Sequence, residues 1–234
     1  MRKIDSERLS QTFRQFEGRY HLTITAVYKP FKEFKVRWTP NPCAKSINFE
    51  VSDYMSRIPD KALRDFAGHI LEKSVRKVSK PYPESVMKAM ESKEFFEFMQ
   101  PLYISRSRNL TGSAAGKAYD LMESAKRVVE QGLISPETLE GTVLSWTKTP
   151  NIRRVGYVSM VSRTIAISSI MDNEDVPEFV MDFVVYHELL HLEVGLKASR
   201  SNPHDKDFEE LEARFPQHQK AEQILGQIYA KNRR

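Results

Sequence analysis

Cysteine is almost absent from this 234-residue chain, which contains Cys43 alone. A lone cysteine excludes an intrachain disulfide and excludes a zinc site built from several cysteines. Long apolar runs are also missing, since no stretch approaches the roughly 20 apolar residues that span a bilayer. Residues 1–7 lack the apolar core of a signal peptide. We therefore expect a cytoplasmic protein that does not contact a membrane.

The net charge of +5 is distributed unevenly along the chain. Residues 1–110 hold 21 Lys and Arg against 13 Asp and Glu, whereas residues 111–234 hold 15 against 18. A basic N-terminal half would suit a nucleic acid or an acidic partner. Lysines that only solvate amphipathic helices would give the same count. No nucleic-acid-binding motif accompanies the charge, so nucleic acid stays an open alternative as a partner.

Hydrophobic periodicity predicts an α+β fold in two regions, separated by the polar, glycine-containing residues 109–116. We assign residues 1–110 to a basic N-terminal α+β region and residues 111–234 to a second domain. The predicted strands are 21–28, 34–39, 46–51, 142–147, 154–160 and 163–168, with a turn at 40–42. The predicted helices are 7–17, 59–78, 84–99, 117–130, 205–214 and 217–231, with a further one from about 175–178 to Gly195.

Residues 187–191 read His-Glu-Leu-Leu-His, a His-Glu-x-x-His motif in a strongly apolar segment. Helix-start signals precede the motif, and Gly195 supplies a helix stop. On a helix, His187 and His191 lie one turn apart on the same face, so both imidazoles can bind one metal ion. Glu188 then lies where a carboxylate can take a proton from a zinc-bound water. Two histidines held by core hydrogen bonds are the alternative, but uncompensated polar groups on a buried helix favour a metal.

A catalytic zinc site needs a third protein ligand, with the fourth position left to water. The metzincin spacing fails, because Val194 and Lys197 stand where its glycine and third histidine belong. His204 follows a polar, turn-forming segment that can fold back toward the motif. Glu210 is the rival, at a separation used by zincins that take a glutamate from a second helix, and His218 is more distant. We expect His204 to be the third ligand, with Glu210 as the alternative.

The C-terminal half also contains a series of short segments: Trp146, Arg-Arg-Val-Gly-Tyr at 153–157, Thr-Ile-Ala-Ile-Ser at 164–168, Val-Tyr-His-Glu-Leu-Leu-His at 185–191, and His204-x-x-x-Phe208. This series resembles the SprT-like and YgjP-like zinc metallopeptidases over roughly residues 117 to 215. The resemblance implies a zincin-like domain in which a small antiparallel sheet packs on the helix of the motif. It also implies that His187, His191 and His204 bind one Zn²⁺ per chain and that Glu188 is the general base. The segment before His204 is longer than in the shortest relatives, which keeps Glu210 open.

The resulting prediction is a zinc metallopeptidase that hydrolyses peptide bonds of a protein or peptide substrate through a zinc-activated water, with Glu188 as general base. A substrate strand is expected to pair with a sheet edge near 155–159 or 164–168. Candidates to stabilise the oxyanion are Arg153, Arg154, Tyr157 and Tyr186.

Two other function classes stay open. Eukaryotic relatives of the family cut proteins crosslinked to DNA, so a DNA-associated protease acting on DNA-bound proteins is one alternative. A non-catalytic binding module that keeps the zinc for structure is the other, although structural zinc sites usually have four protein ligands.

The N-terminal region contains a possible internal repeat of the segments around the His-Glu-x-x-His motif. The N-terminal series is Trp38, residues 47–52, Pro59 and His69. It corresponds to Trp146, residues 164–168, Pro177 and His187 in the C-terminal half. In both series the histidine lies ten residues after the proline. Ile70 and Lys73 replace the glutamate and the second histidine of the motif. The hypothesis is a degenerate duplicate of the catalytic unit that cannot bind zinc, with coincidence as the alternative.

Overall fold

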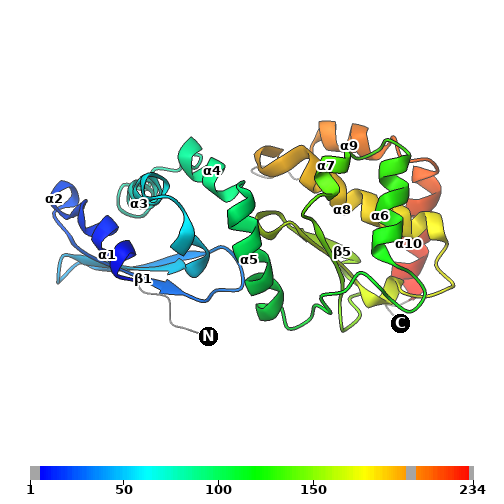
Figure 1. The fold of residues 1–234 in the computed structure, drawn as a ribbon, viewed down its shortest axis with the longest axis horizontal. Coiled ribbons are helices and arrows are strands. Elements are labelled where there is room, and N and C mark those ends of the chain that lie inside the picture. Colours follow the sequence, from blue (N-terminus) through cyan, green and yellow to red (C-terminus); the bar gives the residue numbers. More distant parts are fainter. Residues whose placement is uncertain (1–5, 199–203, 232–234) are drawn as a thin grey trace. The chain divides into compact units, whose positions relative to one another are not determined.

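The computed structural model describes residues 6–198 and 204–231. The chain divides into two compact units, Met1–Arg106 and Ser107–Arg234. Each unit combines a three-stranded sheet with helices (Figure 1), so the α+β class expected from the sequence is confirmed. The division falls just before the boundary predicted between residues 110 and 111. In the described residues, no helix combines the length and the apolar character needed to cross a bilayer.

The N-terminal unit contains α1 (Glu7–Arg14), α2 (Glu17–Tyr20), β1 (Thr23–Lys29), β2 (Val36–Asn41), β3 (Ser46–Ser52), the 3₁₀ helix η1 (Asp53–Arg57), α3 (Asp60–Val75), α4 (Glu84–Met90) and α5 (Lys93–Arg106). In its sheet, β3 lies in the middle, parallel to β1 and antiparallel to β2. Buried Ile24 and Ala26 alternate with exposed Thr25 and Val27 on β1. The alternation means that β1 buries one face and leaves the other in solvent.

Two local predictions for this unit are wrong. The sequence predicts one helix over 84–99, but Ser92 separates α4 from α5 and accepts a hydrogen bond from Phe95 N at 3.3 Å, which starts the second helix. The sequence places Pro40 and Asn41 in a turn, but both belong to β2. Proline is tolerated there because β2 is an edge strand.

The C-terminal unit contains α6 (Leu121–Glu130), α7 (Pro136–Leu139), β4 (Val143–Trp146), β5 (Gly156–Ser159), η2 (Met160–Ser162), β6 (Thr164–Ile167), η3 (Ser169–Met171), α8 (Glu178–Ala198), α9 (Lys206–Glu212) and α10 (His218–Lys231). Its strand β6 lies between β4 and β5, antiparallel to β5 but parallel to β4. The sheet is therefore mixed, and the antiparallel sheet implied by the resemblance is wrong. The reason is the path of the chain, which crosses from β4 to the far edge as β5 and then returns through η2 to insert β6 in the middle.

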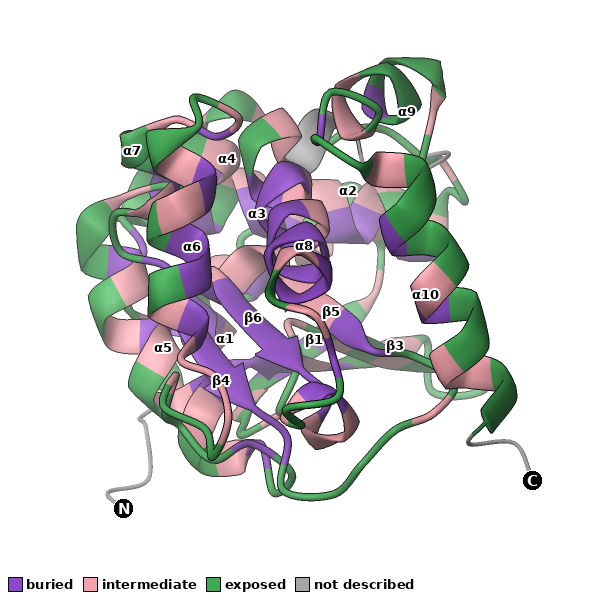
Figure 2. Cartoon of the chain, turned by 90° about the vertical axis from the view of Figure 1, so that its right-hand side faces the viewer, coloured by how far each residue is buried: buried purple, intermediate pink, exposed green. Residues whose placement is uncertain are grey.

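Helix α8 runs through the core of this unit (Figure 2), in contact with α6 on one side and α10 on the other. Val180 and Val185 are fully buried on it. Asp182 is buried too, and both of its oxygens accept hydrogen bonds from Arg127 of α6, at 2.9 and 2.7 Å. Gly195, with φ at 75°, interrupts the helical backbone at the position where the sequence predicts a stop.

The two units share one topology. In each, a helix precedes three strands, the third strand inserts between the other two and runs parallel to the first, and a helix preceded by proline follows. His69 on α3 and His187 on α8 occupy corresponding helices. The tryptophans do not correspond, because Trp38 lies on the second strand of its unit and Trp146 on the first. The predicted internal repeat is therefore wrong for the tryptophans. Duplication remains a hypothesis, and the shared topology supports it.

Candidate metal centre

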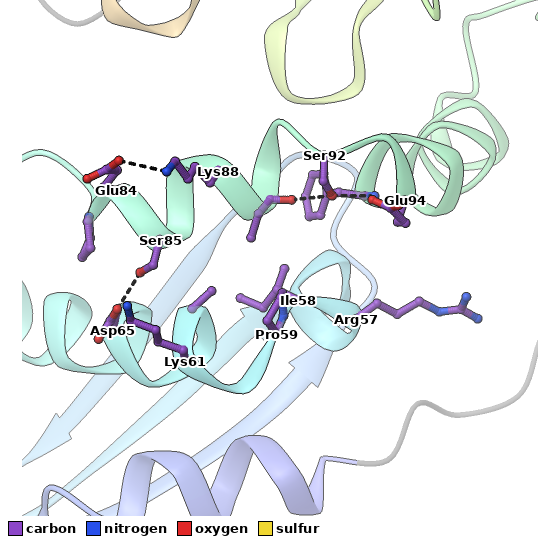
Figure 3. Close-up of a pocket in the computed structure, with 14 residues that line it drawn as sticks. Arg57, Ile58, Pro59, Lys61, Asp65, Glu84, Ser85, Lys88, Ser92 and Glu94 are labelled. Atoms are coloured by element: carbon purple, nitrogen blue, oxygen red, sulfur yellow. Dashed lines mark hydrogen bonds and ion pairs between the residues drawn. The ribbon is translucent and has the colours of Figure 1, made fainter.

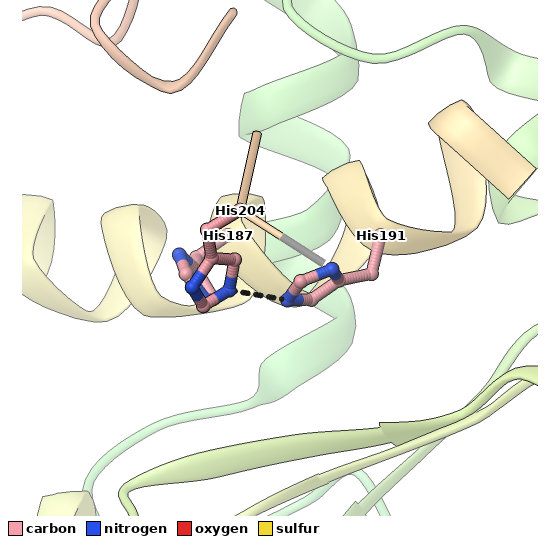
Figure 4. Close-up of side chains that lie close together, drawn as sticks. All are labelled: His187, His191 and His204. Atoms are coloured by element: carbon pink, nitrogen blue, oxygen red, sulfur yellow. Dashed lines mark hydrogen bonds between the residues drawn. The ribbon is translucent and has the colours of Figure 1, made fainter. Parts of the chain in front are cut away.

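Three histidines lie together in the C-terminal unit (Figure 4). His187 and His191 lie on α8 and His204 lies just before α9, with one nitrogen of each within 4.8 Å of the others. His191 Nε2 and His204 Nε2 are 3.1 Å apart. Two nitrogens held tetrahedrally by one zinc-sized ion, each at about 2.05 Å, would be roughly 3.3 Å apart. The spacing therefore fits a metal ion, and the three histidines expected to be ligands are brought together.

Phe208 supports all three imidazoles. The Asp205 side chain accepts a hydrogen bond from Phe208 N at 3.0 Å, which caps α9 directly after His204. The buried Phe208 ring stacks on His191 with the ring centroids 4.6 Å apart. It also lies 4.9 Å from the ring of His204 and 5.3 Å from that of His187. One core side chain thus links the cluster to the packing of α9.

The three imidazoles differ in their tendency to bind protons. Burial, together with positive charge on His187 and His204, lowers the pKa of His191 to about 4. Burial and the charge of His187 also lower the pKa of His204. A metal ion requires such neutral imidazoles. For His187, burial acts to lower the pKa, but the hydrogen bond with Glu212 and the charges of Glu188 and Glu212 outweigh it and raise the pKa.

Glu212, at the end of α9, orients His187. Its Oε1 lies 2.5 Å from His187 Nδ1, which leaves Nε2 of that ring for a metal. Burial acts to raise the pKa of Glu212, but the hydrogen bond to His187 and the charges of nearby histidines lower it. Carboxylates in this position fix the tautomer and the ring orientation of metal-binding histidines. Sequence reasoning missed Glu212, although its spacing of four from Phe208 places these two residues on one side of α9.

Glu188 is only 5 % exposed, and burial raises the pKa of its carboxyl to about 7 against the opposing charges of His187 and Arg154. The carboxyl packs directly on the backbone of Gly156 in β5. A Cβ at that position would lie 2.9 Å from both Cδ and Cγ of Glu188, and closer still to Oε1. Side-chain carbons do not approach that closely, so glycine at position 156 is what lets Glu188 occupy its place.

A cleft of about 610 Å³ opens beside the cluster. Its lining includes the three histidines and Glu188, together with residues of β5, α8 and α10. The candidate base and the candidate ligands therefore face a space that a substrate can enter.

The outer edge of β5 borders this cleft. Val155 O accepts a hydrogen bond from Ser168 N at 2.7 Å, so the backbone of Val155 faces β6. Because orientation alternates along a strand, the backbone groups of Gly156 and Val158 face outward. Arg154 Nε donates to the outward-facing Gly156 O at 2.9 Å. Among the described residues no strand pairs with this edge of β5. β6 lies between β4 and β5, so the other predicted substrate edge, at 164–168, is wrong.

The residues expected to stabilise an oxyanion lie in different surroundings. Arg153 and Arg154 line the cleft. The Arg154 guanidinium also stacks on the Tyr157 ring, 5.2 Å from its centroid, and its charge acts on the histidines of α8. Tyr186 is buried and donates a hydrogen bond to Leu211 O at 2.5 Å. Arg154 is therefore held in place beside the cleft, while Tyr186 supports the packing of α9 on α8.

Glu210 and His218 do not belong to the histidine cluster of the described residues. Glu210 is exposed on α9, and it is Glu212, half a turn further on, that reaches the site. His218 Nε2 lies 3.8 Å from Glu212 Oε2, whereas His187 contacts the other oxygen, Oε1, of that carboxylate.

A larger cleft of about 900 Å³ lies in the N-terminal unit, lined by α3, α4 and the start of α5 (Figure 3). Two of its carboxylates have local partners, since Lys88 lies 3.2 Å from Glu84 and Asp65 accepts a hydrogen bond from Ser85 at 2.5 Å. The described part of this unit contains no group of potential metal ligands. We therefore place the candidate site in the smaller cleft.

Comparisons of the chain with protein-family models, with curated proteins and with solved structures find no match.

Proposed function

We propose that this chain is a zinc-dependent metallopeptidase of the SprT-like or YgjP-like kind, with one Zn²⁺ bound by His187, His191 and His204. The proposal is carried by the grouping of three histidines with a buried glutamate at the side of an open cleft. Structural zinc sites use four protein ligands, whereas catalytic sites use three and keep one position open. The three-histidine set therefore favours catalysis over a non-catalytic binding module.

The chain's own residues have separate tasks in this mechanism. Zinc, when bound, lowers the pKa of water and polarises a peptide carbonyl. A carboxylate oxygen of Glu188 accepts the proton of the attacking water and passes it to the leaving amine. Arg154, anchored by its bond to Gly156 O, donates to the oxygen on which negative charge develops. Glu212 keeps the His187 ring turned toward the ligand position.

An extended polypeptide suits this cleft as a substrate. The outward-facing backbone of Val158 offers an N–H and a C=O to a substrate strand, in the manner of β-strand addition. Pairing at that edge would bring a peptide bond past Glu188, which packs against the same strand at Gly156.

Hydrolysis of fluorescently quenched casein tests the proposal. We expect activity from the zinc-loaded protein, loss of activity with a chelator, and recovery when zinc is returned. Glu188→Gln should retain zinc but lower kcat at least about 100-fold, because general acid–base catalysis contributes 10²–10⁴-fold. Glu210→Gln, which changes an exposed carboxylate of α9, is the matched control and should keep full activity. Hydrolysis that survives the chelator or Glu188→Gln would exclude this mechanism.

A DNA-associated protease is the second candidate. The excess of basic over acidic residues in 1–110, 21 against 13, favours it. Binding through phosphates releases counterions, so affinity for labelled DNA should fall steeply between about 50 and 200 mM salt. Casein hydrolysis stimulated by DNA would support this candidate, and no DNA binding at low salt would remove it.

A further inference from the structure

The cleft beside the histidines has an apolar part that the proposed chemistry does not use. Phe183 and Val184 line it from α8, one helical turn before His187 and Glu188 and on the same side of the helix. Val158 lines it from β5. An apolar surface therefore begins about one turn from the candidate base.

Helix α10 supplies further lining of this cleft. Glu222, Leu225, Gly226 and Tyr229 all border it, and their spacing of three, four and seven residues places them on one face of the helix. Leu225 is buried, while Tyr229 packs against the core of the unit. Gly226 is the position on this face that carries no side chain.

Neither backbone conformation nor packing requires a glycine at 226. Gly195 has a positive φ and Gly156 lies against Glu188, but Gly226 has no positive φ and a Cβ added there would meet nothing within 4 Å. In a helix interior glycine is less favourable than alanine. Its effect at this position is to leave the cleft wider along α10.

We propose that the apolar part of the cleft binds a large apolar side chain, such as Leu, Met or Phe, of an extended polypeptide beside the bond to be cut, and that Gly226 sets the size limit. Placement beside the scissile bond rests on the proposed peptidase function. The occupant follows from the neighbouring edge of β5, whose outward-facing backbone can pair with an extended chain. Side chains of such a chain alternate, so one of them points away from solvent toward Phe183 and Val184.

Peptide binding tests this subsite without requiring turnover. The probes are two fluorescein-labelled peptides of one polar sequence that differ only in a central Ala or Phe. Anisotropy titrations use the full-length, zinc-loaded Glu188→Gln protein, which cannot cleave them by the proposed mechanism. We expect the Phe peptide to bind about tenfold tighter or more, in the range that apolar pockets discriminate. Adding Gly226→Leu should reduce this preference below about twofold, because the added side chain takes the space of the Phe ring.

Gln227→Leu is the matched control, because it adds the same side chain to an exposed position of α10 outside the cleft lining. It should preserve the preference for Phe. Gly226→Ala, the milder change, should reduce that preference partly, and circular dichroism verifies that each variant folds. Equal binding of both peptides, no binding of the Phe peptide, or a preference that Gly226→Leu leaves intact would overturn the inference. A Phe preference in a wild-type protein that does not hydrolyse casein would instead refute the peptidase function and leave the subsite standing.

Discussion

Glu188 occupies its place because residue 156 has no side chain, and this contact gives a prediction. Gly156→Ala puts a Cβ against the Glu188 carboxyl and forces that group to move. We expect zinc to be retained, since no ligand changes, while kcat for casein falls about 100-fold or more. Gly18→Ala is the control, because a Cβ at Gly18 meets nothing within 4 Å, and it should be neutral. A fully active Gly156→Ala protein would contradict the role given to Glu188.

The contact between Glu212 and His187 leads to a prediction about metal affinity. Replacing it with Gln removes the charge that faces His187 Nδ1 at 2.5 Å but preserves the shape of the side chain. Zinc affinity, measured by competition with a chromogenic chelator, should fall about 10- to 100-fold, as is usual for carboxylates that support ligands. Glu210→Gln on the same helix should leave affinity unchanged. Equal affinities for both variants would mean that Glu212 does not act through His187.

The sequence predicts those site residues whose relation is local. His187 and His191 follow from helical spacing, because residues four apart share one face wherever the helix lies, and Glu188 follows from its place in the motif directly after His187. Glu212 and Gly156 are out of reach of that argument, since each meets the site only through the packing of another element on α8. His204 can be predicted only in part. The turn-forming segment before it indicates that the chain folds back toward the motif, but not which side chain then reaches the metal site.

Among the elements, α8 depends on a buried ion pair that joins it to α6. Asp182→Asn removes the charge that accepts two hydrogen bonds from Arg127 inside the unit. We expect the free energy of unfolding in urea to fall by about 1.5–3 kcal/mol, the range for hydrogen bonds to charged groups. Glu178→Gln removes a second ion pair of Arg127, at 3.2 Å, but the Glu178 side chain is 63 % exposed, so the loss of stability should be within about 0.5 kcal/mol. A larger loss of stability in Glu178→Gln than in Asp182→Asn would show that Asp182 does not anchor α8 to α6.

Most strands and helices can be predicted, because alternation and helical periodicity depend on residues that are close together in the sequence. β1, for example, alternates buried and exposed residues over its length. Strand order is not predicted in the same way, since β6 inserts between β4 and β5 only after the chain has crossed the sheet. This is why an antiparallel sheet and a free edge at 164–168 are wrong, while the edge at 155–159 is available.

For the whole molecule, the shared topology of the two units supports a duplication in which, among the residues that the structure describes, the C-terminal copy alone holds a histidine cluster. In the N-terminal unit, His69 on α3 packs on the Tyr82 ring with the centroids 4.6 Å apart. The histidine that corresponds to His187 thus packs on an aromatic ring, and we expect the N-terminal unit to contribute no zinc ligand.

The three-histidine zinc site is tested by the zinc content of the purified chain, measured by elemental analysis after incubation with zinc and removal of the excess. We predict about one zinc per chain in the wild type and in His69→Ala, and a large loss in His204→Ala, whose exposed side chain can be removed without disturbing the core. Zinc retained in full by His204→Ala, or lost in His69→Ala, would contradict the three-histidine site. A wild-type chain without zinc would remove the basis for metallopeptidase chemistry.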